Sequence, residues 1–281
     1  MCGDCNYHCD YCIQSPANRR GQPAPALVES TLAFLTTLPG QWEIKMTGGE
    51  PFVSQAFLDR IVPVLVGESP HRISLLTNLS AGPAALRKLA ELTRGRLTVL
   101  SASLHLDHTT VEAFLDRLTL LREASGPGPS FVVNAVLAPR LLSRLAAAKA
   151  AVEAAGFRFF PQLMKVKGGV YAYSPEERAQ IAELLGGWEH AEATRSANLA
   201  PSYAGRRCFA GARYLVLTQH GEAWSCRTSR RHGEGRLGDV RQGVRLRTTA
   251  LPCPYLICPC AVPANRGMIE GVSPRLGEEP R

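Results

Sequence analysis

Three cysteines lie close together near the start of the chain, in the segment Cys5-Asn6-Tyr7-His8-Cys9-Asp10-Tyr11-Cys12. Three thiols at this spacing allow one loop to wrap a single metal centre. Structural zinc usually takes four ligands, and His8 could supply the fourth, so zinc is one interpretation of the segment. A [4Fe-4S] cluster is the other, because a cluster held by three thiolates keeps one iron open for a further ligand. The cysteines alone leave both interpretations open.

A second motif, Met46-Thr47-Gly48-Gly49-Glu50-Pro51, follows a predicted strand. Its glycines let another molecule approach the backbone, and Glu50 offers a carboxylate to a cationic group. Together, CxxxCxxC and Gly-Gly-Glu resemble the radical S-adenosylmethionine superfamily, in which the cysteines follow the first strand and Gly-Gly-Glu follows the second. This resemblance favours the iron-sulfur cluster over zinc.

The resemblance implies a set of ligands. Cys5, Cys9 and Cys12 would hold the [4Fe-4S] cluster, whose open iron takes the amino and carboxylate groups of the methionine moiety of S-adenosylmethionine. Residues 48–50 would contact that amino group, and the ring of Tyr11 would pack near the adenine. The cofactor-binding residues implied in this way are Tyr11, Gly48, Gly49, Glu50, Pro51, Asn78, Ser103 and Asn134. One electron from the reduced cluster would break a C–S bond and release a 5′-deoxyadenosyl radical, which abstracts a hydrogen atom from the substrate.

Several polar residues stand at or near the ends of later predicted strands. They are Asn78, Ser103, His105, Asn134 and Gln162. In the resembling enzymes, polar residues at such positions contact ribose, carboxylate or substrate. A solvated residue, or one satisfied within the core, is an equally good interpretation of each. A lone strand histidine such as His105 is more often structural than a proton carrier.

A second group of cysteines lies in the last third of the chain. These are Cys208, Cys226, Cys253, Cys258 and Cys260. The first two flank Gly221, with twelve residues before the glycine and four after it. This spacing, with Leu237-Gly238-Asp239-Val240 downstream, resembles the SPASM and twitch modules that carry an auxiliary [4Fe-4S] cluster. A full SPASM module has more cysteines, so a single-cluster twitch-like module is the closer match, and a zinc ribbon is the alternative.

Basic residues are concentrated near these cysteines. The formal net charge of the chain is +8, and residues 206–247 contain ten arginines, no lysine and three acidic residues. The arginines could offset the negative charge of a cluster or bind an anionic substrate, although for any single arginine a solvated surface is the simpler interpretation. An RNA-modifying or RNA-binding protein is the alternative function. The sequence supports it little, because it lacks an aromatic and basic strand pattern of the kind that stacks bases.

The elements that must position these residues follow from the hydrophobic pattern. Short apolar runs alternate with amphipathic stretches, which is typical of βα units and a parallel sheet. The predicted strands are residues 42–46, 72–76, 97–103, 131–137 and 157–162. The predicted helices are residues 83–93, 109–124 and 140–155, and one that Ser174 caps and that ends near Leu185.

Pattern and resemblance together predict an α/β fold. Residues 1–187 would form a partial (β/α)6 TIM-like barrel, and residues 206–267 a small twitch- or SPASM-like iron-sulfur module with a hairpin at residues 214–224. Residues 268–281 are predicted to be a disordered tail. Only residues 1–4 precede the cysteines, so we expect the first strand of the barrel to be minimal or to begin upstream.

The expected protein is a radical S-adenosylmethionine enzyme that oxidises, epimerises or crosslinks a small molecule or a ribosomal peptide. Its cofactors would be S-adenosylmethionine, the [4Fe-4S] cluster that binds it and a second, auxiliary [4Fe-4S] cluster, with electrons from a donor such as flavodoxin or ferredoxin. Nine cysteines without a signal peptide or an apolar run of ~18 residues predict a cytoplasmic protein with no membrane partner. A plain electron carrier would leave the Gly-Gly-Glu motif without a purpose. Because the chain begins at the cluster, we expect no winged-helix domain for peptide recognition, which favours a small molecule or a peptide delivered by a separate protein.

Overall fold

The computed structural model describes residues 3–13, 21–166, 169–191, 202–256, 258 and 262–272. The chain divides into two compact units, Met1–Ala191 (unit 1) and Glu192–Arg281 (unit 2). Unit 1 carries the N-terminal cysteines and the Gly-Gly-Glu motif, and unit 2 carries the C-terminal cysteines. Within the described ranges, no helix has the length and apolar character that crossing a membrane requires.

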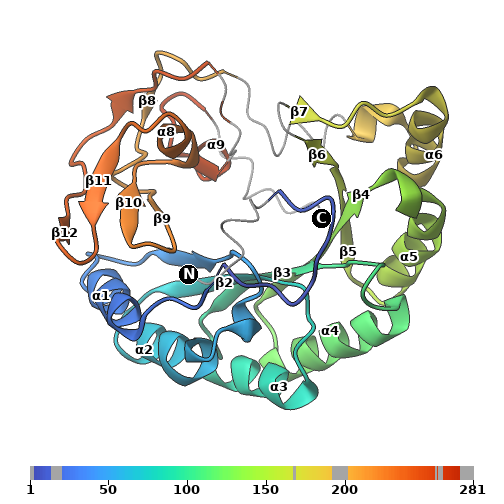
Figure 1. Ribbon diagram of the computed structural model, residues 1–281, viewed down its shortest axis with the longest axis horizontal. Helices are drawn as coiled ribbons and strands as arrows, with labels where there is room; N and C mark the ends of the chain where they lie inside the picture. Colours follow the sequence, from blue (N-terminus) through green and yellow to red (C-terminus); the bar gives the residue numbers. More distant parts are fainter. Residues whose placement is uncertain are drawn as a thin grey trace. The chain divides into compact units, whose positions relative to one another are not determined.

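A five-stranded parallel sheet forms the centre of unit 1 (Figure 1). Its strands are β1 (Glu43–Met46), β2 (Arg72–Thr77), β3 (Leu97–Ser103), β4 (Ser130–Leu137) and β5 (Arg158–Leu163), paired in chain order. All five are parallel, so their carboxyl ends lie at the same edge, where (β/α) enzymes place their active sites. The predicted α/β class is confirmed. A short hairpin of β6 (Lys165–Val166) and β7 (Gly169–Val170) follows the sheet.

Helices connect the strands and lie along the outer side of the sheet (Figure 1). They are α1 (Pro25–Thr36), α2 (Val62–Gly67), α3 (Pro83–Leu92), α4 (Val111–Ser125), α5 (Leu142–Ala154) and α6 (Pro175–Leu185). A π-helical turn, Phe57–Ile61, precedes α2. Leu86, Leu89 and Leu118 are fully buried, so α3 and α4 turn apolar faces to the core. The expected cap of α6 is present: Ser174 and Glu177 form a capping box.

The predicted barrel has six strand units, and the part of the chain that the structure describes contains a sheet of five parallel strands. Residues 3–13 contain no strand. The backbone N–H of Glu50 donates to the carbonyl of Asp4 at 2.8 Å, which joins the segment before the cysteines to the loop after β1. This contact positions the segment without the ladder of hydrogen bonds that defines a strand.

Unit 2 is built around a four-stranded antiparallel sheet of order β12-β11-β10-β9. The strands are β9 (Val216–Leu217), β10 (Glu222–Trp224), β11 (Arg236–Asp239) and β12 (Gly243–Val244). The first two form the predicted hairpin, in which Val216 pairs with Trp224. A separate pair joins β8 (Arg207–Cys208) to β13 (Leu251–Pro252), and two short helices, α8 (Arg227–Arg231) and α9 (Val262–Asn265), complete the described part.

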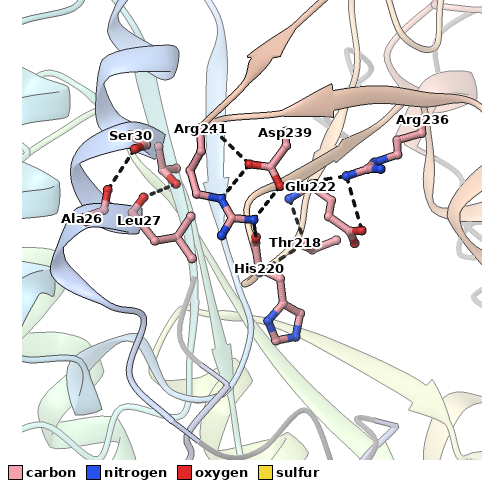
Figure 2. A network of polar contacts seen from close by, with 10 residues as sticks. Ala26, Leu27, Ser30, Thr218, His220, Glu222, Arg236, Asp239 and Arg241 are labelled. Atoms are coloured by element: carbon pink, nitrogen blue, oxygen red, sulfur yellow. Dashed lines mark hydrogen bonds and ion pairs between the residues drawn. The ribbon is translucent and has the colours of Figure 1, made fainter.

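Asp239 ties two turns of unit 2 together (Figure 2). Its carboxylate accepts hydrogen bonds from Nε and Nη2 of Arg241, both at 2.8 Å, and Nη2 also donates to the carbonyl of His220 at 3.2 Å. Arg236 lies 4.0 Å from the same carboxylate. The segment 237–240 therefore anchors the turn after β9 to the turn after β11.

Residues 268–272, at the start of the predicted tail, lie within the described part of unit 2. Ile269 is only 4% exposed, packs with Tyr203 and Ala264, and forms a β-bridge with Cys208. Burial of this apolar side chain brings residues 268–272 into unit 2. The remainder of the predicted tail, residues 273–281, lies outside the described residues.

Candidate functional site

The three N-terminal cysteines differ in exposure: Cys5 is half-buried, Cys9 is buried and Cys12 is exposed. Burial raises the pKa of the Cys9 thiol, a hydrogen bond with Tyr11 lowers it, and the nearby Cys12 and Cys5 thiols raise it further. The backbone N–H of Tyr7 donates to Sγ of Cys5 at 3.4 Å. The cysteines are therefore close enough to interact, and the loop supplies hydrogen bonds to sulfur.

This donor set fits an iron-sulfur cluster. Thiolates hold such clusters, and hydrogen bonds to the sulfurs help to set their reduction potentials. Among the described residues, no group of three or more His, Cys, Asp or Glu side chains is placed to hold a single metal ion. The structure thus gives the positions of the thiols and their hydrogen bonds. That they hold a cluster stays a prediction.

Glu50 links the ends of β1 and β2. Its carboxylate accepts hydrogen bonds from Oγ1 of Thr77 at 2.7 Å and from the backbone N–H groups of Asn78 at 2.6 Å and Phe52 at 3.3 Å. The side chain is 1% exposed. The pKa of Glu50 is raised from its usual value, because the effect of burial outweighs these hydrogen bonds, which lower it. The structure therefore gives Glu50 a function within the protein, beside its predicted contact with the cosubstrate.

The two glycines of the motif have different reasons to be glycine. Gly48 has a φ of 152°, in the region that side chains disfavour. A Cβ on Gly49 would lie 1.7 Å from the carbonyl oxygen of Asp4. The backbone of the segment just before Cys5 therefore packs directly against Gly49, and a side chain there would clash with it.

Asn78 joins the cysteine loop to the end of β2. Its Nδ2 donates to Oδ1 of Asn6 at 3.0 Å and lies 3.9 Å from Sγ of Cys5. Its backbone N–H binds Glu50, as described above. Asn78 thus connects the cysteine loop with the Gly-Gly-Glu motif, two segments that the sequence separates widely.

Ser103 and Asn134 lie side by side on β3 and β4. Oδ1 of Asn134 accepts a hydrogen bond from Nε2 of Gln162 at 3.1 Å. Nδ2 of Asn134 is buried and has no hydrogen-bond partner among the described residues. A buried amide donor without a partner is costly to the fold, and a ligand that accepts its hydrogen bond would remove that cost.

Pro51 is buried and opens a short 3-10 turn after the motif. A small hollow of about 20 Å³ lies beside it. Residues 46–49 and 51 line it, together with Ser54, Phe57 and Ile61. The space beside the two glycines is therefore about the size of one water molecule.

The structure places His105 against the cysteine loop. Nδ1 of its ring lies 3.4 Å from Sγ of Cys9 and 3.0 Å from the hydroxyl of Tyr11. Burial lowers the pKa of His105 to about 4. The ring of Tyr11 also has the guanidinium of Arg140 5.5 Å from its centre. A lone strand histidine is typical of a structural residue, and the sequence near the cysteines carries no pattern that predicts the contact between His105 and Cys9.

Four of the five C-terminal cysteines lie in the described part of unit 2, and Cys260 lies outside it. Burial raises the pKa of Cys208, a backbone hydrogen bond from Ala210 lowers it, and the nearby Cys253 and Cys226 thiols raise it. Cys258 packs against the same apolar cluster as Cys208. Sγ of Cys226 accepts the backbone N–H of Ser229 at 3.2 Å, at the start of α8. The structure brings together thiols that are far apart in the sequence.

Comparison with known proteins shows what the fold resembles. A scan against models of protein families finds no match, and neither does a search of curated proteins. The solved structure of anSMEcpe with bound AdoMet and Kp18Cys peptide is 14% identical, with a TM-score of 0.59 over 86% of this chain and 76% of that one. SuiB of Streptococcus suis, bound to the precursor peptide SuiA, is 14% identical, with a TM-score of 0.55 over 84% of this chain and 60% of that one.

Both neighbours are radical S-adenosylmethionine enzymes. The fold of this chain is therefore similar to the fold of these two enzymes, as the two motifs predict. At this level of identity the likeness establishes the fold. The ligand assignments, and the twitch or SPASM character of unit 2, stay predictions.

Proposed function

We propose that this protein is a radical S-adenosylmethionine enzyme whose cluster is held by Cys5, Cys9 and Cys12. The observation that carries the proposal is the joining of the two motifs: Asn78 binds both the Glu50 carboxylate and the cysteine loop. Asp4, next to the first cysteine, accepts the backbone N–H of Glu50. A cosubstrate bound to a cluster in this loop would therefore meet the Gly-Gly-Glu segment.

When bound, the cluster and S-adenosylmethionine supply reductive C–S cleavage and a 5′-deoxyadenosyl radical that takes a hydrogen atom from the substrate. The chain holds and orients them. The three thiolates would hold the cluster, the backbone of residues 48–50 would contact the amino group of the cosubstrate, and the ring of Tyr11 would pack near the adenine. Nδ2 of Asn134 offers an unused donor. Ser103 and Pro51 are the remaining residues predicted to contact the cosubstrate.

A second [4Fe-4S] cluster in unit 2 is part of the proposal. Its four ligands would come from Cys208, Cys226, Cys253, Cys258 and Cys260. The closeness of the first three thiols supports this second cluster, since Cys253 and Cys226 raise the pKa of Cys208. Removal of one hydrogen atom leaves a carbon radical, and an oxidation is complete only when a further electron leaves, so a second cluster would serve as the acceptor. A reduced donor such as flavodoxin or ferredoxin would supply electrons to the first cluster.

A peptide is the substrate class that the comparisons favour. The two solved structures with the same fold contain a peptide, Kp18Cys in one and the precursor peptide SuiA in the other. A small molecule, which the sequence favours equally, is the alternative. Peptides and small alcohols can be offered in parallel once cleavage of the cosubstrate is established.

The test is anaerobic incubation of the reconstituted protein with S-adenosylmethionine and dithionite, followed by measurement of 5′-deoxyadenosine. Wild type should form it. Cys9→Ala should form none, because one ligand of the open-iron cluster is lost. Cys2→Ala is the matched control, since Cys2 lies outside the CxxxCxxC motif. Formation at the wild-type rate by Cys9→Ala would overturn the assignment.

A further inference from the structure

Three polar groups meet at one point on the cysteine loop. The His105 ring nitrogen Nδ1 lies 3.0 Å from the hydroxyl of Tyr11 and 3.4 Å from Sγ of Cys9. The hydroxyl of Tyr11 also hydrogen-bonds the Cys9 sulfur. The two rings are nearly parallel, with an interplanar angle of 13° and centres 5.8 Å apart. His105 follows β3, so these contacts fasten the loop to the carboxyl edge of the sheet.

When Cys9 is a thiolate, Nδ1 of His105 lies closer to the Tyr11 hydroxyl, at 3.0 Å, than to the Cys9 sulfur, at 3.4 Å. A thiolate is an acceptor, so the Tyr11 hydroxyl must donate its proton to Sγ. Its oxygen is then free to accept, and Nδ1 of His105 must carry the hydrogen that it accepts. The result is a chain of donors, His105 to Tyr11 to Cys9, directed at the sulfur.

We propose that His105 is a positioning residue of the cluster site: its Nδ1–H orients the Tyr11 hydroxyl toward Cys9 and so raises the reduction potential of the cluster. The inference rests on the proposed function, because it takes Cys9 as a ligand. A reduced cluster carries one more negative charge than an oxidised one. A hydrogen bond donated to a ligand sulfur stabilises that extra charge, and the donor chain strengthens the last bond in it.

His105 acts through Tyr11, so its effect should depend on the tyrosine hydroxyl. Tyr11→Phe deletes the last donor and keeps the ring. His105→Leu deletes the first donor, and His105→Asn restores an amide N–H close to the place of Nδ1. His108→Ala is the matched control, because His108 lies in the same turn and stacks on Tyr7, with ring centres 4.3 Å apart.

The experiment measures iron content and then the midpoint potential by an EPR-monitored redox titration without S-adenosylmethionine. Tyr11→Phe and His105→Leu should each shift the potential to more negative values. The double variant should shift it no further than Tyr11→Phe, because the two groups form one chain. His105→Asn should recover part of the shift, and His108→Ala should match wild type.

The outcomes separate the inference from the function on which it rests. A wild-type protein that binds no cluster through the N-terminal cysteines would sink the proposed function. A wild-type cluster with an unchanged potential in Tyr11→Phe would overturn the inference alone. Where His105→Leu loses iron, Tyr11→Phe and His105→Asn decide the matter, because both retain the shape of the site. An equal shift in His108→Ala would show a general loosening of the loop and would also overturn it.

Discussion

The buried Glu50 carboxylate holds the ends of two parallel strands together, and this function can be tested apart from cosubstrate binding. Glu50→Ala leaves the donors at Thr77, Asn78 and Phe52 without their acceptor. Each unsatisfied buried donor costs about 1–3 kcal/mol, so unit 1 should lose at least ~2 kcal/mol of stability in a denaturant melt. Glu50→Gln should also destabilise it, since its amide N–H₂ would face donors.

The control for this experiment is Glu91→Ala, on the exposed side of α3. An exposed helix position tolerates alanine within about 0.5 kcal/mol. If Glu50→Ala melts like wild type and loses only affinity for S-adenosylmethionine, the carboxylate serves binding and its bonds to the strands contribute little.

Gly49 lets the segment before the cysteines lie against the loop after β1. In Gly49→Ala the new Cβ would meet the carbonyl oxygen of Asp4 at 1.7 Å, a contact with backbone that no rotamer change relieves. The segment must move, and the hydrogen bond from Glu50 N–H to Asp4 is lost. We expect iron bound by the N-terminal cysteines to fall several-fold.

Gly67→Ala is the matched control for the glycine experiment. A Cβ on Gly67 would meet nothing within 4 Å, and the residue ends α2 without a positive φ. Iron content should stay at the wild-type level. A Gly49→Ala protein with full iron content would show that the position of residues 3–4 is irrelevant to cluster binding.

The strands were predictable because each is a short apolar run between polar turns, and a buried parallel strand needs no other signal. Two helical segments, α1 and Phe57–Gly67 with its π-helical turn, were missed. Val28, Leu32 and Leu35 of α1 are spaced for one helix face and are buried, so a signal was present. In the second segment, Pro63 argues against a helix interior, whereas the structure places it in the first turn of α2.

The sequence predicts ligands for the site, which stay a prediction, and it does not predict the residues that support them. Cysteine spacing is local, so the sequence displays it directly. The contacts of His105 with Cys9 and of Asn78 with Asn6 join residues that are 96 and 72 positions apart. Such contacts depend on how the strands align in the sheet, and no local pattern encodes them. For the same reason, the closeness of Asp4 to Gly49 was not foreseen.

The Asp239–Arg241 contact should make unit 2 sensitive to acid. Hydrogen bonds from Arg241 lower the pKa of Asp239 below its usual range. A lowered pKa stabilises the folded state above the unfolded value of about 3.9, and this stabilisation is lost as the pH falls through the folded value. Asp239→Asn should therefore destabilise unit 2 at pH 7, and the difference from wild type should shrink below about pH 4.

Hydrogen exchange of the β10 and β11 amides, compared at the two pH values, reads this effect within unit 2. Asp59→Asn is the control, because Asp59 is 73% exposed and pairs with Lys88 at the surface, where an ion pair adds little. A gap between wild type and Asp239→Asn that is the same at both pH values would mean that the charge of Asp239 is not what stabilises the turns.

The chain as a whole places its two groups of cysteines in separate compact units. Each unit has its own sheet and its own core. If each group holds one cubane, reconstituted protein should contain about eight irons. Because the ligands belong to different units, loss of one cluster should leave the other in place, which allows their functions to be separated.

Cys226→Ala is the variant that separates them. The N-terminal cysteines are unchanged, so it should still form 5′-deoxyadenosine from S-adenosylmethionine. Turnover of an identified substrate should be lost, because the substrate radical has no acceptor for its last electron. Since ligation can hold a small unit together, circular dichroism and a thermal melt must show that the variant is folded. Ser202→Ala, an exposed position in the same unit, is the control. A folded Cys226→Ala protein that lacks the second cluster and still turns over substrate normally would make that cluster structural, and the oxidative mechanism would then have to be abandoned.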